Sequence, residues 1–190
     1  MDRAVEPCMD LKPDDVVLVS VLGAVHDSCL PLNEIIAVAN NMAPEVWQPT
    51  AQVIGNCIVS ALNAGQLRLS APVNCYAGVC YEITDFGRHV LRDRLRKSLP
   101  SQCASLARTC VAAKLCFLDC MEAADQTIQV EELAHAYRNR LKALQQREEG
   151  CAGSRCHSKL WLDHEIERCG WELAWLERLR SNISRDVIDQ

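Results

Sequence analysis

"WQPTAQVIGNCIVSALNAGQLRLS", residues 47–70, changes its hydrophobic period part-way along, and this change decides the fold. Thr50 is placed to cap a helix whose apolar residues recur every three or four positions: Val53, Ile54, Cys57, Ile58, Ala61 and Leu62. Gly65 suits the left-handed position that follows a helix. Leu67 and Leu69 then alternate with Arg68, as in a strand. The stretch therefore predicts a helix that leads directly into a β-hairpin.

The segments on either side predict a compact unit around this helix. Residues 14–25, "DDVVLVSVLGAV", indicate a short buried helix, and "SCLPLNEIIAVANNM" (28–42) indicates a second, starting near Pro31 with Asn33 as its N-cap. "VCYEIT" (79–84) alternates again, so residues 66–73 should pair with 79–83 in a hairpin. Thr84 then caps a helix with Phe86, Val90, Leu91 and Leu95 on its apolar face. Three helices followed by a hairpin make a winged helix, predicted over residues 14–100 after a tail of residues 1–13.

The chain after Pro100 contains no further proline and is predicted to be helical. Two helices are expected in 103–122 and 129–149, and a third in "KLWLDHEIERCGWELAWLERLRSNI" (159–183). The last helix carries a coiled-coil-like seam formed by Leu162, Ile166, Cys169, Leu173 and Leu176. Its tryptophans lie off that seam, so one helix cannot bury both surfaces by itself. We therefore expect residues 101–190 to be a helical dimerisation region, with the seam as the dimer interface.

Composition restricts the class of protein. The chain has 190 residues, is 49% hydrophobic and has a net charge of −5. No apolar run approaches the ~20 residues of a membrane span, and the acidic N-terminus has no apolar core typical of a secretion signal. A cytoplasmic protein without a membrane partner is predicted. Catalysis and cofactors are not expected, because the histidines are scattered and no nucleophile motif or Gly-rich phosphate loop is present.

The order and spacing of these motifs resemble the PadR family of bacterial transcriptional regulators. The N-terminal likeness lies in "DDVVLVSVLGAVHDSCLPLNEIIAVAN" and "CYEITDFGRHVLRDRL", and the C-terminal likeness in "AKLCFLDCME" and "HEIERCGWELAWLERLR". The resemblance implies a mainly α-helical homodimer, with a winged helix-turn-helix and a C-terminal helical dimerisation region. It also implies binding to operator DNA and, as in many members, release from DNA by a phenolic, drug or other effector.

Charge raises an alternative to DNA binding. Between Lys12 and Arg68 the chain has no Lys or Arg, although DNA affinity comes chiefly from cations that neutralise phosphates. In the DNA-binding interpretation, amides would read adenine, Thr50 at the helix N-terminus would hold a phosphate, and arginines beyond the helix would hold the backbone. The amides are Gln48, Gln52 and Asn56, and the arginines are Arg68, Arg88 and Arg92. The alternative is a dimer that has lost DNA and binds a protein partner at its acidic helix-turn-helix face, which contains Asp27, Glu34 and Glu45.

Three other groups of residues each allow two interpretations. Trp161, Trp171 and Trp175 are either dimer core or the lining of a pocket for a flat effector. Cys75 and Cys80 either form a disulfide across the wing turn or only pack beneath it. Four residues near the last helix are either zinc ligands or an ordinary linker with scattered thiols: Cys151, Cys156, His157 and His164. Their spacing matches no usual zinc site, so no metal is expected, and most of the 12 cysteines are predicted to be buried free thiols.

Overall fold

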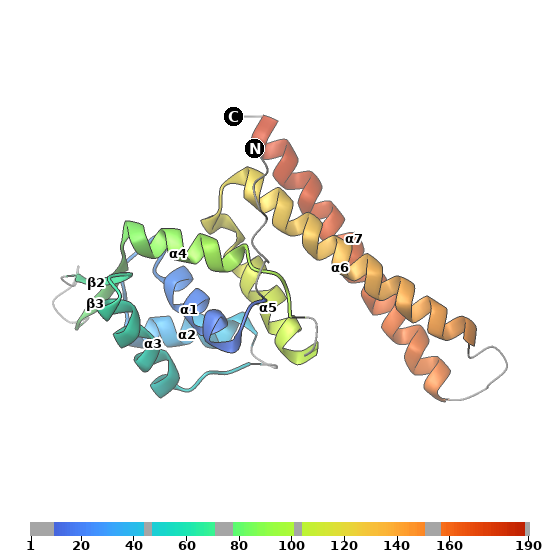
Figure 1. Ribbon diagram of the computed structural model, residues 1–190, viewed down its shortest axis with the longest axis horizontal. Coiled ribbons are helices and arrows are strands. Elements are labelled where there is room, and N and C mark those ends of the chain that lie inside the picture. Colours follow the sequence, from blue (N-terminus) through green and yellow to red (C-terminus); the bar gives the residue numbers. More distant parts are fainter. Residues whose placement is uncertain (1–9, 44–46, 71–77, 101–103, 151–156, 189–190) are drawn as a thin grey trace, which may run out of the picture. The chain divides into compact units, whose positions relative to one another are not determined.

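The computed structural model describes residues 10–43, 47–70, 78–100, 104–150 and 157–188 (Figure 1). The chain divides into two compact units between Met121 and Glu122. This point lies after the boundary expected at Pro100, and it places helix α5 (Ala104–Cys116) in the N-terminal unit. None of the described helices is both long enough and apolar enough to cross a bilayer.

The N-terminal unit is a winged helix, and the prediction of a mainly helical fold with a small antiparallel sheet is confirmed. Its elements in chain order are α1 (Pro13–Ala24), β1 (Leu30–Pro31), α2 (Leu32–Met42), α3 (Ala51–Asn63), β2 (Leu67–Ser70), β3 (Cys80–Ile83), α4 (Asp85–Leu95), α5 and the short 3-10 helix η1 (Leu118–Cys120). The strands form one antiparallel sheet in the order β1-β3-β2.

Strand β1 was not predicted, and it changes the start of α2. Pro31 pairs with Cys80 and Leu30 with Tyr81, so this segment is strand rather than helix. Pro31 then occupies the N-cap position of α2 without a side-chain cap, and Asn33 lies inside the helix. The predicted Asn33 cap is therefore wrong. Two residues are too few for a strand to be read from periodicity.

The hairpin pairs as expected over the part that the structure describes. Leu67 lies opposite Ile83, and both side chains are buried in the core. Arg68 lies opposite Glu82 on the other face of the sheet. Gly65 has a φ of 71°, which is the left-handed conformation predicted after α3. The wing turn itself, residues 71–77, lies outside the described residues.

Helix α1 lies at the centre of the core, where Val16, Val21 and Leu22 are fully buried. Helix α3 turns Ile54, Ile58 and Ala61 toward this core, and α4 contributes Leu91 and Leu95. Two predicted core residues are instead exposed: Val53 by 44% and Phe86 by 55%. Val53 precedes Ile54 by one residue, which rotates its side chain ~100° around the helix and away from the buried arc.

The motif "TDFG" at the start of α4 fixes the wing against the end of α3. Thr84 Oγ1 accepts a hydrogen bond from Gly87 N (3.0 Å) as the predicted cap, and it donates to Gly65 O (2.7 Å). A Cβ at Gly87 would lie 2.1 Å from the carbonyl oxygen of Gln66. This close approach between α4 and the backbone requires glycine.

Asp15 joins the start of α1 to the end of α4. Its Oδ2 accepts hydrogen bonds from Lys12 N (3.0 Å) and Lys97 Nζ (2.9 Å), and its Oδ1 lies 3.0 Å from Arg94 Nε. Burial raises the pKa of Asp15. The Lys97 and Lys12 hydrogen bonds and the charges of Lys97 and Arg94 outweigh burial, so that its pKa is lowered overall. The ionised carboxylate is therefore the form that the native state favours.

The C-terminal unit is a hairpin of two long helices, α6 (Ala123–Gly150) and α7 (His157–Ile188), which lie side by side (Figure 1). Cys169 and Leu176 of the predicted seam are each only 2% exposed within this single chain. The thiol of Cys169 donates to the carbonyl oxygen of Tyr137 on α6 at 3.5 Å. Leu162, Ile166 and Leu173 are half-buried. Cys169 and Leu176 of the seam are therefore already covered within one chain, and the other three seam residues are covered in part.

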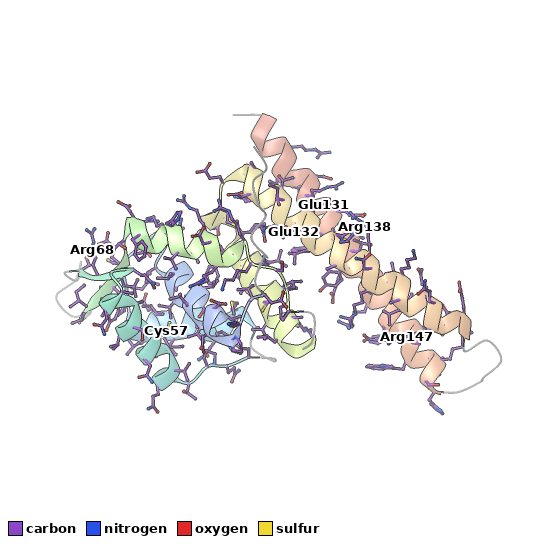
Figure 2. All side chains as sticks on the ribbon, viewed as in Figure 1. Cys57, Arg68, Glu131, Glu132, Arg138 and Arg147 are labelled. Carbon is purple, nitrogen blue, oxygen red and sulfur yellow. The ribbon has the colours of Figure 1, made fainter. Side chains whose placement is uncertain are left out.

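Ion pairs also join α6 to α7. Arg138 lies between Glu131 of its own helix (3.0 Å) and Glu177 of α7 (3.7 Å), and Arg180 of α7 pairs with Glu131. Figure 2 shows Glu131 and Arg138 along α6. Hydrogen bonds from Arg138 and Arg180 lower the pKa of Glu131, so this carboxylate stays ionised. These pairs fix how the two helices face one another.

Candidate nucleic-acid interface

The exposed face of α3 is uncharged. Gln52, Asn56 and Ser60 follow one another at four-residue spacing, and all three are exposed. Asn63 and Val59 lie on the same side and are also exposed. The face therefore offers amide and hydroxyl groups together with an apolar side chain. Such groups suit direct contact with base edges in a groove but contribute no charge against phosphates.

The N-terminus of α3 is available to an anion. Thr50 is exposed and its Oγ1 accepts a hydrogen bond from Val53 N at 3.4 Å, which confirms the predicted cap. The first turn of α3 has no acidic residue, so no carboxylate of that turn offsets the positive end of the helix dipole. Gln48 is exposed just before the helix, and it already takes part in another interaction within the chain.

Arg68, the first of the predicted phosphate contacts, is held by a carboxylate. Its Nε and Nη2 donate to Glu82 Oε2 (3.1 Å) and Oε1 (2.8 Å) across the β2–β3 pair. Figure 2 shows Arg68 on the wing strands. The hydrogen bond from Arg68 lowers the pKa of Glu82, and the same bond raises the pKa of Arg68. Both groups therefore stay ionised, and the positive charge of Arg68 is cancelled locally.

Arg88 and Arg92, the other two predicted contacts, are half-buried on α4. Arg88 Nη1 donates to the carbonyl oxygen of His26 at 2.6 Å and so ties α4 to the loop after α1. The carbonyl acceptor carries no net charge, so this bond does not offset the positive charge of Arg88, whereas Glu82 offsets that of Arg68. The structure therefore does not present the three arginines as a set of equivalent exposed cations.

Several residues of this surface were missed from the sequence. Ser60, Val59 and Asn63 extend the exposed face of α3, and a helical wheel centred on the buried residues would have found them. Glu82 decides the charge state around Arg68. Its role depends on the hairpin register, which can be deduced only when the turn length is known.

The structure describes only some of the residues in the predicted metal and thiol sites. Cys75, Cys151 and Cys156 lie outside the described residues. His164 lies beside Trp161, with ring centroids 5.5 Å apart. Within the described parts of the chain, no three His, Cys, Asp or Glu side chains are grouped as a metal would require. Cys80 is buried.

The tryptophans of α7 lie on the side of that helix away from the seam. Trp161, Trp171 and Trp175 share one helix face, because the positions 161, 164, 168, 171 and 175 are spaced by three and four residues in turn. His164 and Arg168 occupy the positions between Trp161 and Trp171. Their exposed fractions are 64%, 74% and 46%, and the neighbouring Leu160 is 67% exposed. We call Leu160 and these three tryptophans the tryptophan ridge. Large apolar side chains that are exposed together on one helix face are typical of interaction surfaces.

Residues 8–180 match a family model described as "Putative AphA-like transcriptional regulator". The chain belongs to this family of AphA-like transcriptional regulators. The match confirms the predicted regulator class and, with it, the prediction that the protein is not an enzyme. No curated protein matches the chain.

Similar solved structures include PadR and a PadR-like regulator. Bacillus subtilis PadR in complex with operator DNA is 17% identical, with 88% of this chain and 99% of that chain covered and a TM-score of 0.40. The same protein in complex with p-coumaric acid is 17% identical, with 91% and 98% covered and a TM-score of 0.41. The PadR-like regulator BC1756 from Bacillus cereus is 14% identical, with 90% and 99% covered and a TM-score of 0.39.

Proposed function

We propose that this AphA-like regulator acts as a homodimer and binds operator DNA through α3, with base contacts that outweigh its few phosphate contacts. The observation that carries the proposal is the exposed, uncharged face formed by Gln52, Asn56 and Ser60 in the recognition position of a winged helix. Amide side chains pair with adenine N6 and N7, and a bidentate pair contributes ~1–3 kcal/mol of discrimination.

Phosphate binding in this proposal depends on few groups. The N-terminus of α3 with Thr50 can take one phosphate through backbone N–H groups. Arg88 and Arg92 supply positive charge from α4, whereas the charge of Arg68 is cancelled by Glu82. Salt should therefore weaken binding less steeply than it does for regulators with a cationic wing.

The dimer in this proposal is formed by the tryptophan ridge rather than by the seam. The seam already packs on α6, so the surface of α7 left for a second subunit is the exposed ridge. Effector binding at the same tryptophans remains a proposal. Because their side chains are largely exposed in one chain, a closed pocket there needs walls from the second subunit.

A second candidate function is a protein-interaction module that has kept the winged helix and lost DNA. The observation that favours it is the Arg68–Glu82 pair, together with the apolar wing residues Leu69 and Val79, which are 61% and 56% exposed. A partner that binds this face would meet apolar and acidic groups, including the exposed Asp27 and Glu34. In this case duplex DNA would not bind at any salt concentration.

Competition binding on the gene's own promoter region separates the two functions. Asn56→Ala should reduce the preference for promoter DNA over a scrambled duplex by roughly 5- to 150-fold per recognition helix, corresponding to ~1–3 kcal/mol for a lost base contact. Asn41→Ala, an exposed asparagine on α2, is the matched control and should leave the preference unchanged. Equal binding of both duplexes by wild-type protein would contradict recognition through α3.

A further inference from the structure

Two thiols that are distant in the sequence meet where β1 joins the wing. The β1–β3 register places Pro31 opposite Cys80, and Cys29 precedes Pro31 by two residues, so Cys29 falls on the same side of the sheet as Cys80. The thiol of Cys29 is also close enough to that of Cys80 to contribute to raising its pKa. Both are free cysteines. From the sequence, Cys75 was the expected neighbour of Cys80, because β1 could not be foreseen.

The two thiols differ in their access to solvent. Cys29 is half-buried in the loop that precedes β1, whereas Cys80 is only 4% exposed. Burial, the neighbouring Cys29 and the charge of Glu34 raise the pKa of Cys80. An oxidant in solution therefore reaches Cys29 first, and Cys80 is placed to react with the oxidised sulfur rather than with the oxidant. The loop position of Cys29, outside the paired residues, leaves its backbone free to adjust to disulfide geometry.

We propose that Cys29 and Cys80 are a thiol-oxidation site that forms a reversible disulfide when the protein meets a hydroperoxide. In the first step the Cys29 thiolate attacks hydrogen peroxide; an S–O bond forms, the O–O bond breaks, and a sulfenic acid and hydroxide result. In the second step the Cys80 sulfur attacks the Cys29 sulfur; the S–S bond forms, and the sulfenic hydroxyl leaves with the thiol proton as water. The two sulfurs are oxidised and the peroxide is reduced to water. A thiol reductant reverses the bridge by exchange.

The bridge would close a loop that contains α2, α3 and β2. It would tie the segment before α2 to strand β3 and so restrain the recognition helix relative to the wing. A cross-link of this kind raises the melting temperature mainly by restricting the unfolded chain. The proposal does not depend on the function of the winged helix, because it concerns only the chemistry of two adjacent thiols.

Peptide mapping of the peroxide-treated full chain tests the bridge. Digestion with trypsin and glutamyl endopeptidase places Cys29 in residues 4–34, because Glu6 and Lys12 both precede proline, and Cys80 in residues 69–82. The expected product is a cross-link between these two peptides that disappears on reduction. Cys29→Ser should abolish it, and Cys80→Ala should do the same if that variant folds. Cys8→Ser and Cys75→Ser, which remove the other cysteine of each peptide, should retain it.

Three results would overturn the proposal. The first is a cross-link that persists in Cys29→Ser. The second is a bridge contained within residues 69–82, which would join Cys75 to Cys80. The third is free alkylation of both Cys29 and Cys80 after a peroxide dose that has already consumed the exposed Cys116. The melting temperature supplies a second readout: peroxide should raise it in the wild type and not in Cys29→Ser.

Discussion

Glu82→Gln tests whether the Arg68–Glu82 pair limits DNA binding. The amide introduced by this substitution can still hydrogen-bond Arg68 but carries no charge, so the guanidinium becomes available to a phosphate. In the wild type the cationic contacts are Arg88 and Arg92 from each subunit, which gives four cationic contacts and a log–log salt slope of about −3.6 at ~0.9 per phosphate neutralised. The variant adds Arg68 from each subunit, so the slope should steepen to about −5.4.

These slopes are separable by fluorescence anisotropy on one labelled duplex. Between 50 and 200 mM salt, the affinity of the wild type should fall roughly 150-fold and that of Glu82→Gln roughly 1,800-fold. Glu132→Gln changes the net charge equally but lies on α6, and its slope should match the wild type. If Glu82→Gln also keeps the wild-type slope, Arg68 does not approach the backbone. If Glu132→Gln steepens the slope as much as Glu82→Gln does, the change comes from the total charge of the protein and not from release of Arg68.

Three further predictions concern assembly and stability. Trp171→Ala should raise the dimer dissociation constant on the order of 1,000-fold, because each subunit loses about 2 kcal/mol of interface energy. Ile128→Ala, which also truncates an exposed apolar side chain, is the control. If sedimentation gives Trp171→Ala the wild-type dissociation constant, the tryptophan ridge is not the dimer interface. Asp15→Asn should lower the free energy of unfolding by about 1.5–3 kcal/mol at neutral pH. Because the pKa of Asp15 is lowered in the native state, the Asp15 carboxylate stabilises the fold above its unfolded-state pKa, and this stabilisation is lost as the pH falls through its native-state pKa. The free energy of unfolding of Asp15→Asn should therefore lack this part of the pH dependence in acid. Gly87→Ala should lower the free energy of unfolding by about 1–3 kcal/mol, because the new Cβ would collide with the carbonyl oxygen of Gln66. Gly55→Ala, whose Cβ would have nothing within 4 Å, is the control and should be neutral or stabilising in thermal melts.

Local patterns in the sequence were sufficient for much of the fold. The helix-to-strand switch at Gly65, the caps at Thr50 and Thr84 and the existence of the hairpin after α3 all depend on residues close together in the chain. Strand β1 could not be predicted because its two residues form a strand only by pairing with β3. The contact between Cys29 and Cys80 follows from that pairing and was missed for the same reason.

The interfaces were harder to predict than the elements. A coiled-coil seam shows that a helix needs a partner, but not whether the partner is the preceding helix or a twin; here Cys169 and Leu176 pack within the chain. The charge available to DNA was also hard to predict. In the sequence Arg68 is a cation free to contact a phosphate, whereas in the structure Glu82 offsets its charge. DNA contacts by Gln48, Gln52, Asn56 and Thr50 remain predictions.

In the function proposed above, this winged helix binds operator DNA with few phosphate contacts. The most direct measurement is the salt dependence of wild-type binding to the gene's own promoter region, followed by fluorescence anisotropy. We expect measurable binding at low salt and micromolar protein, with a log–log slope of about −3.6. Absence of binding under those conditions would contradict it and favour the protein-interaction module.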